Sequence, residues 1–177
     1  KREPKQKERS NLEKVIHETM NKCVYQRKCG GCTYQHLSYE KQLKEKQKTI
    51  EKLLEKLKKP EPIIGMENPL YYRNKVHRVV AGDKRGNCYT GIYEANSHRG
   101  VRGEKCLIEN QKSDEICQTI ANLMKSFKMR PYNEDTGYGF LRHILIRSGH
   151  NTGQYLVTLV TSSPVFPSKN NFVKALR

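Results

Sequence analysis

Cys23-Val-Tyr-Gln-Arg-Lys-Cys29-Gly-Gly-Cys32 brings three thiols into ten consecutive residues. Thiolates at this spacing can converge on one metal centre, because cysteine ligates both zinc and iron–sulfur clusters. The two glycines allow the backbone to take positive φ and to fold closely around such a centre. The chain of 177 residues carries 34 Lys and Arg against 18 Asp and Glu, a formal net charge of +16. This charge favours a polyanionic partner: RNA, DNA or an anionic membrane surface.

The bulk composition excludes a membrane-spanning protein. No apolar run approaches the ~18 residues that a spanning helix needs. Residues 1–5, Lys-Arg-Glu-Pro-Lys, lack the apolar stretch of a signal peptide. We therefore expect a cytoplasmic, monomeric protein. In a reducing cytosol, clustered cysteines bind metal more often than they form disulfides.

The cysteine run lies between two predicted helices. Residues 1–22 are expected to form a basic arm and a short helix, which the capping box Ser10-Asn-Leu-Glu13 begins. Residues 23–59 are expected to form a cluster-binding loop and a long helix over 39–58, capped by Ser38. The apolar stripe of that helix consists of Leu43, Ile50, Leu53, Leu54 and Leu57. Pro60 and Pro62 end it.

Residues 60–177 change to a strand pattern with one helix. Strands over 71–81 and 87–93 flank a Gly-rich turn, and a second hairpin pairs 139–148 with 154–161. A helix from Ser113, its expected cap, to Met129 separates the hairpins, with Ile116, Ile120, Leu123, Met124 and Phe127 facing inward. The order predicts an α+β fold: a small cysteine-rich module with helices, joined to a truncated domain with an antiparallel sheet.

Tetrahedral coordination needs a fourth ligand, for which the residues alone leave Cys88, Cys106, Cys117 and His36 as candidates. Cys88 and Cys117 are equally well explained as packed thiols, since a cysteine outside a site is often buried. Cys29 and Cys32 could instead form a dithiol redox pair. No thioredoxin-like βαβ pattern surrounds them.

A family resemblance follows from five motifs in order. Cys23-x5-Cys29-Gly-Gly-Cys32-Thr-Tyr-Gln-His36 resembles the iron–sulfur segment of the RNA uracil-5-methyltransferases, specifically the bacterial 23S ribosomal RNA branch. Segments similar to the central domain of that family are Tyr72-Arg-Asn-Lys75, Gly91 to His98, Cys106-Leu-Ile, and Gly139 to Arg147 followed by Thr152-Gly153. Ile92 departs from the pattern by replacing an aromatic residue.

The resemblance implies that Cys23, Cys29, Cys32 and Cys106 ligate a [4Fe–4S] cluster, with His36 next to the cluster ligands or at the entry to the following helix. A packed histidine is the plainer reading of His36, and it is favoured over ligation. Members of the family also carry a Rossmann-like domain that binds S-adenosylmethionine and supplies a cysteine nucleophile and an acidic base. No such segment is visible here. We therefore expect a fragment without catalytic residues or an S-adenosylmethionine site, inactive on its own. Residues 1–22 are too few for the β-barrel module that often precedes the cysteines.

Basic and aromatic residues interleave along the predicted strands, as RNA-binding surfaces require. The candidate RNA contacts are Tyr72, Arg73, Lys75, His98, Arg142, His143 and Arg147. Strand alternation places Arg73, Lys75 and His77 on one face, and Arg78 on the other. The plainer alternative is a solvated sheet face.

The leading interpretation is the cluster-bearing, RNA-positioning part of an S-adenosylmethionine-dependent 23S rRNA uracil-C5 methyltransferase. In it the cluster has a structural role, joining Cys106 to the cysteine loop. A stand-alone RNA-binding protein stabilised by zinc is the first alternative, and a dithiol oxidoreductase is the second. Iron and sulfide analysis separates the first two, and disulfide exchange tests the third.

Overall fold

The computed structural model describes residues 23–83 and 85–177. The predicted arm, short helix and capping box of residues 1–22 lie outside the described residues. The described chain divides into two units: residues 23–26 and 32–69 form the first, and residues 27–31 and 70–177, except 84, form the second.

The long helix of the first unit, α2 (Tyr39–Leu53), is shorter than the predicted 39–58. The Lys41 N–H donates to the Ser38 side chain, so the predicted cap is confirmed. The helix ends where the Leu54 N–H donates to the Ile50 carbonyl. No residue of α2 is buried, and Leu53 is 72% exposed. Without tertiary packing of its apolar stripe, the lysine-rich last turn has little to support it.

The segment after α2 returns along the helix through side-chain contacts. The Gln47 amide accepts from the Ile63 N–H at 2.8 Å and donates to the Glu61 carbonyl at 3.4 Å. The Met66 N–H donates to the Tyr39 hydroxyl at 2.7 Å. Polar contacts therefore hold this unit together.

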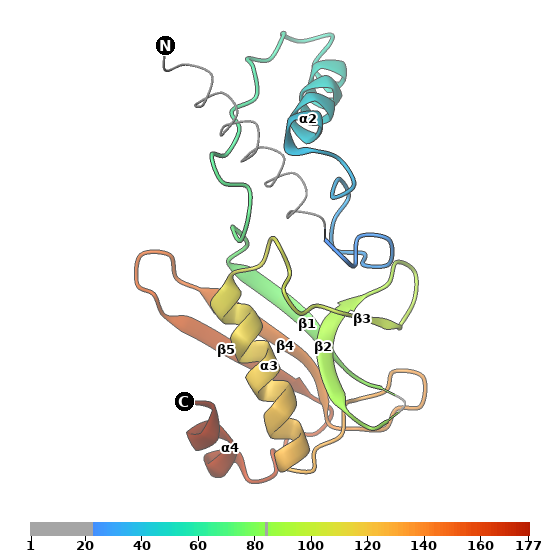
Figure 1. Ribbon diagram of the computed structural model, residues 1–177, viewed down its shortest axis with the longest axis vertical. Coiled ribbons are helices and arrows are strands. Elements are labelled where there is room, and N and C mark those ends of the chain that lie inside the picture. Colours follow the sequence, from blue (N-terminus) through green and yellow to red (C-terminus); the bar gives the residue numbers. More distant parts are fainter. Residues whose placement is uncertain (1–22, 84) are drawn as a thin grey trace, which may run out of the picture. The chain divides into compact units, whose positions relative to one another are not determined.

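The second unit contains a five-stranded sheet of order β3-β2-β1-β4-β5 (Figure 1). The strands are β1 (Lys75–Gly82), β2 (Cys88–Tyr93), β3 (Gly100–Arg102), β4 (Leu141–Ser148) and β5 (Tyr155–Thr161). Every neighbouring pair is antiparallel. The predicted α+β fold with an antiparallel sheet and both hairpins is thereby confirmed, whereas the short β3 was not predicted.

Two helices, α3 (Gln111–Ser126) and α4 (Lys169–Leu176), pack on one face of the sheet. The buried core between them consists of Val76, Val80, Cys117, Ile120, Met124, Met129, Leu141, Ile144, Ile146 and Phe172. The five residues predicted to face inward from α3 all pack in or against this core. The predicted cap is wrong, because the Asn110 side chain accepts from the Ser113 N–H. The helix α4 was not predicted.

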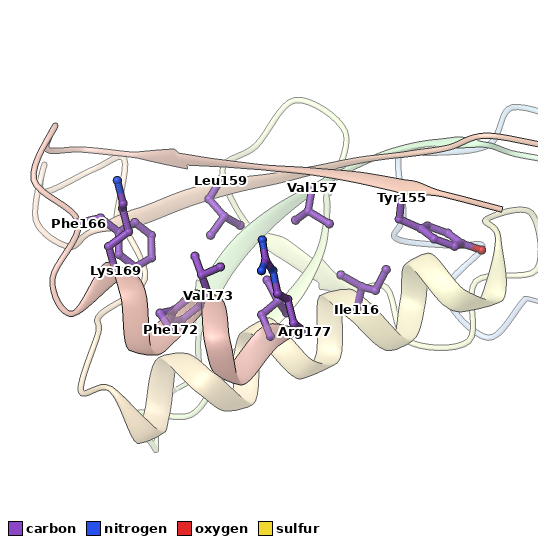
Figure 2. Close-up of a pocket in the computed structure, with 10 residues that line it drawn as sticks. Ile116, Tyr155, Val157, Leu159, Phe166, Lys169, Phe172, Val173 and Arg177 are labelled. Atoms are coloured by element: carbon purple, nitrogen blue, oxygen red, sulfur yellow. The ribbon is translucent and has the colours of Figure 1, made fainter. Parts of the chain in front are cut away.

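An apolar groove runs between α3, β5 and α4 (Figure 2). Ile116 of α3, Val157 and Leu159 of β5, and Phe172 and Val173 of α4 point toward it. None of the residues predicted to bind metal or RNA lines this groove, so the candidate sites lie elsewhere in the chain.

The first strand starts at Lys75 rather than at the predicted residue 71. Tyr71 has a φ of 54°, a left-handed conformation that a strand cannot continue. Residues 71–73 instead pair with the segment after Cys106: Tyr71 N–H donates to the Leu107 carbonyl and Arg73 N–H to the Ile108 carbonyl, both at 2.8 Å. This pairing ties the Cys106 segment to the start of β1.

The fourth strand contains a bulge at Arg142, which the sequence reading missed. Leu141 pairs with Thr161 and His143 with Val160, so β4 has one extra residue at this point. The bulge explains why the core positions of β4 fall at 141, 144 and 146, a spacing of three and then two. It also directs Arg142 away from the regular strand pattern.

Replacing Gly91 with alanine is expected to lower the free energy of unfolding by about 2 kcal/mol. A Cβ at Gly91 would overlap the carbonyl oxygen of Val101 on the paired strand β3. Urea denaturation provides the measurement. Gly82→Ala in β1 is the control, because its Cβ meets only the Pro131 ring at 3.2 Å. Equal stability of the two variants would contradict this reading of β2–β3 packing.

Candidate nucleic-acid interface

The sheet face opposite α3 and α4 carries rows of side chains from three adjacent strands. Residues paired across antiparallel strands share a face. Lys75 of β1 pairs with Arg147 of β4, which pairs with Leu156 of β5. All three side chains are exposed. The structure thus brings together two predicted RNA contacts, with an exposed leucine, 63% accessible, beside them.

Two histidines lie further along this open face. The rings of His77 and His143 meet edge to face, with centroids 5.0 Å apart. Burial, then the neighbouring His77 and Arg142, lower the pKa of His143, while Glu134 opposes them. His143 is therefore held neutral, and it offers a ring and hydrogen-bonding nitrogens rather than a charge.

The bulge residue Arg142 is engaged by a carboxylate that was not predicted. Its guanidinium donates to Glu134 from Nε at 3.2 Å and from Nη2 at 3.0 and 2.9 Å. The same group stacks on the Tyr132 ring, 4.6 Å from its centroid. Glu134 Oε1 also lies 4.0 Å from His143 Nε2. Two predicted RNA contacts therefore share one acidic neighbour.

His98, in the loop between β2 and β3, faces the same acidic segment. Its Nδ1 lies 3.3 Å from Asp135 Oδ1, and both side chains are largely exposed. The ring of Tyr93 lies 5.8 Å from the His98 ring. Burial and then Glu134 raise the pKa of Tyr93, so its hydroxyl stays protonated. The interface therefore includes an aromatic residue that the sequence reading did not select.

Tyr72 and Arg73 stand apart from the strand rows. Tyr72 is 51% exposed. The backbone of Arg73 bridges to Glu109, which fixes its position beside the Cys106 segment. Both were predicted as strand residues, but they precede β1.

Arg78 faces the helix-covered side, as alternation predicted, and is fully buried. It donates to Glu109 at 2.9 Å from Nε and through a second short bond from Nη2, and to Asp114 at 2.7 Å. It also donates to the Thr90 hydroxyl at 3.3 Å and the Gly103 carbonyl at 2.7 Å. All five guanidinium N–H groups are thus satisfied. This arginine is structural, and it cannot belong to an RNA-contacting group.

The predicted metal ligands are divided between the two units. Cys23 and Cys32 belong to the first unit, and Cys29 and Cys106 to the second. Cys29 bridges to Glu94, at the end of β2, and the Gly30 N–H donates to the Tyr93 carbonyl at 3.3 Å. The Gly31 N–H donates to Cys29 Sγ at 3.4 Å. Hydrogen bonds to the ligand sulfurs are a feature of iron–sulfur sites.

The turn that carries Cys106 has a defined conformation. Lys105 takes a left-handed φ of 58°, and its N–H donates to Asp114 Oδ2 at 2.9 Å. Burial raises the pKa of Cys106, and hydrogen bonds from the backbone N–H groups of Ile108 and Glu109 oppose that effect. The pKa of Cys106 is raised overall, so the structure favours its protonated thiol.

The other residues considered as a fourth metal ligand are Cys88, Cys117 and His36. Cys117 is fully buried in the core, and burial raises its pKa to about 12, so it is a packed thiol. Cys88 packs against the same core. His36 is exposed, two residues before the cap of α2, so the plainer alternative of a packed histidine does not hold. Within residues 23–83 and 85–177, no three His, Cys, Asp or Glu side chains gather into a group that could hold a metal ion.

Among the described helices, none has the length and apolarity to cross a bilayer. No protein-family model matches the chain.

Curated proteins with similar sequences share one kind of name. An uncharacterized RNA methyltransferase of Listeria monocytogenes is 38% identical over 87% of this chain and 35% of its own length. Proteins of the same name from Clostridium acetobutylicum and Halalkalibacterium halodurans are 37% and 35% identical, over 92% and 87% of this chain. The chain spans about a third of the length of these relatives.

A solved structure is similar as well. The Pyrococcus abyssi tRNA (uracil-54, C5)-methyltransferase, in complex with S-adenosyl-L-homocysteine, matches with a TM-score of 0.67 and 27% identity. The match covers 82% of this chain and 34% of that enzyme. These similarities in sequence and fold relate the chain to the RNA methyltransferases.

Proposed function

We propose that this chain is the RNA-positioning, cluster-bearing part of an enzyme that methylates C5 of uracil in 23S ribosomal RNA. S-adenosylmethionine is the methyl donor. We expect the chain alone to be inactive, because none of its residues is proposed to act in methyl transfer. We expect it to act as a monomer in the cytoplasm, where its RNA substrate is found.

Three similarities support the reaction class. The relatives are named RNA methyltransferases, and the solved structure is named for uracil C5. That enzyme was solved with S-adenosyl-L-homocysteine, the product of methyl donation by S-adenosylmethionine. Its name specifies tRNA, so the proposal of ribosomal RNA depends on the resemblance of the Cys23–Cys32 motif to the 23S branch.

The observation that carries RNA positioning is the row of exposed cations on the open sheet face. Lys75 and Arg147 are directly paired, and the exposed Leu156 continues their row. The neighbouring His77 and His143 supply flat rings. Cations suit phosphates, and flat or apolar side chains suit unstacked bases, which is the combination that single-stranded RNA requires.

RNA binding by this face is expected to fall steeply with salt. If about six phosphates are neutralised, log Kd changes by roughly 4 to 5 per decade of salt concentration. Replacing both Lys75 and Arg147 with alanine removes two of those contacts, so the slope should become shallower by about 2. Fluorescence anisotropy with a labelled oligouridylate provides the measurement.

Lys112→Ala is the matched control, because Lys112 is an exposed cation on α3, on the opposite side of the sheet, where it pairs with Glu115 at 2.8 Å. Its removal lowers the net charge without touching the open face. The proposed interface is refuted if Lys112→Ala, which removes one charge, weakens RNA binding by half as much as the double replacement of Lys75 and Arg147, which removes two.

We further propose that Cys23, Cys29, Cys32 and Cys106 hold a [4Fe–4S] cluster with a structural role. The four thiols are the donor type that such clusters need. The Gly31 N–H donates to Cys29 Sγ, and hydrogen bonds to the ligand sulfurs are a feature of iron–sulfur sites. The Cys106 segment is bonded to residues 71–73, so a cluster bound there would be coupled to the chain that leads into β1.

A further inference from the structure

An acidic loop contacts the basic open face. In a chain with a net charge of +16, the segment 133–138 places Glu134 and Asp135 beside Arg142 and His98. Both partners are among the residues predicted to contact RNA. A surface that binds RNA by charge therefore has part of its charge already neutralised by the protein itself.

Hydrogen bonds within the loop hold residues 133–138 in a defined conformation. Asn133 Oδ1 accepts from the N–H groups of Asp135 at 2.9 Å and Thr136 at 3.0 Å. The Asn133 N–H donates to the Tyr138 carbonyl and the Gly137 N–H to the Asn133 carbonyl, both at 2.8 Å. Such an Asx-type turn fixes the backbone that carries Glu134.

The loop is also fastened at its base to β4. The Tyr132 N–H donates to the Leu141 carbonyl, and the Phe140 N–H to the Arg130 carbonyl, both at 2.9 Å. The position of Glu134 relative to Arg142 is thus set by backbone hydrogen bonds on both sides.

The guanidinium group of Arg142 is oriented so that it could bind an oxyanion. The bulge directs its side chain out of the strand pattern, and the Tyr132 ring supports the guanidinium plane. Two nitrogens of the fork face the Glu134 carboxylate, the geometry that a phosphate group adopts with arginine. The Arg142 side chain is 37% exposed and that of Glu134 22%, so solvent and ligands reach the pair.

We propose that Glu134 is a specificity-determining residue that occupies the phosphate position at Arg142 until RNA displaces it. This inference rests on the proposed RNA-binding function of the open face. A polyanion that contacts only Arg142 must break the ion pair with Glu134, so it gains little binding free energy. An RNA that also contacts Lys75 and Arg147 gains enough binding free energy to displace Glu134. The ion pair therefore favours RNA that contacts all three cations over RNA that contacts Arg142 alone.

Glu134→Gln keeps the side-chain shape and removes the competing charge. It is expected to strengthen binding of a labelled oligouridylate about fivefold, the equivalent of one partly exposed ion pair. The salt slope should steepen by about 1, because Arg142 now contributes a full phosphate contact. Thermal melting checks that the variant remains folded.

Glu115→Gln is the matched control, since it makes the same charge change on α3, where Glu115 pairs with Lys112. It should change affinity little. In a protein that already carries Arg142→Ala, Glu134→Gln should increase the affinity for oligouridylate no more than Glu115→Gln does. Unchanged or weaker binding by Glu134→Gln overturns the inference, because Glu134 would then only orient Arg142.

A measurement on the unsubstituted protein avoids reliance on variants. The Nε–H resonance of Arg142 should shift as oligouridylate replaces the Glu134 carboxylate, and a resonance unmoved at saturation overturns the inference. Loss of affinity in the Lys75 and Arg147 variants tests the open face itself. The proposed function can therefore hold while the role of Glu134 fails, and the two outcomes are told apart.

Discussion

Replacing Arg78 with methionine is expected to lower the free energy of unfolding by about 3–5 kcal/mol, the usual loss when one partner of a buried ion pair is removed. Methionine fills the space of the side chain but leaves Glu109, which is 2% exposed, as a buried carboxylate without its partner. Thr90 and the Gly103 carbonyl lose their hydrogen bonds as well. Urea denaturation followed by circular dichroism provides the measurement.

The burial of this network explains the size of the expected effect. Burial is the largest single effect and lowers the pKa of Arg78, but the attraction of Glu109 and the hydrogen bonds to Glu109 and Asp114 act together with the neighbouring charges to raise the pKa overall, so the guanidinium stays charged. The network joins β1 to Glu109 and to Asp114 at the start of α3. Its loss should therefore loosen the Cys106 turn together with the helix.

Arg99→Met is the control for the loss of an arginine as such. Arg99 pairs with Glu94 at 2.7 Å but is 76% exposed, so its removal should cost less than about 1 kcal/mol. A second variant, Arg78→Met with Glu109→Met, removes both charges and should recover part of the lost stability. Equal destabilisation by Arg78→Met and Arg99→Met would show that the buried network contributes little.

Elements with a strong period could be predicted from the sequence. The spacing of Ile116, Ile120 and Met124 identified α3 and its buried face, and Gly-rich turns between β-branched runs identified both hairpins. Alternation placed Lys75 and His77 on one face and Arg78 on the other, and the burial pattern of β1 shows that the first of these is the open face. Such local patterns survive folding because they are the patterns that bury one face of an element.

The features that were missed depend on contacts between distant residues. Alternation placed Arg78 on the face opposite Lys75, but its full burial was missed, because only Glu109, 31 residues away, makes that burial tolerable. The bulge at Arg142 exists to satisfy the core at Leu141 and Ile144 together. Tertiary contacts, not propensity, decide these positions.

In the candidate site as well, local patterns identified some residues, while others depend on contacts between distant parts of the chain. Local spacing marked Cys23, Cys29 and Cys32 as possible ligands, and the interleaving of basic and aromatic residues marked Lys75 and Arg147 as candidate RNA contacts. Glu134 had no such signal, because its importance arises from a turn that brings it back to Arg142 eight residues later. Cys106 could be selected only by family resemblance, since Cys88 and Cys117 satisfied the same composition argument.

Replacing Cys106 with serine is expected to remove most of the iron from protein purified without oxygen. A [4Fe–4S] cluster contains about four iron and four sulfide per chain, and the loss of one thiolate ligand leaves it incomplete. Metal ligation supplies folding energy directly, so the variant should also melt at a lower temperature. Iron and sulfide assays, visible absorbance and thermal melting provide the measurements.

Cys88→Ser is the matched control, because Cys88 is also partly buried and packs against the core of the same unit but lies outside the proposed ligand set. It should retain iron and sulfide. Full cluster content in the Cys106 variant, or equal loss in both variants, would contradict the assignment of Cys106. If the unsubstituted protein contains zinc and no sulfide, the site is a zinc site and not an iron–sulfur cluster. In that case, a loss of zinc in Cys106→Ser but not in Cys88→Ser would still identify Cys106 as a ligand. The turn at Lys105, whose N–H donates to Asp114 Oδ2 at 2.9 Å, fixes the backbone beside Cys106 and supports that role.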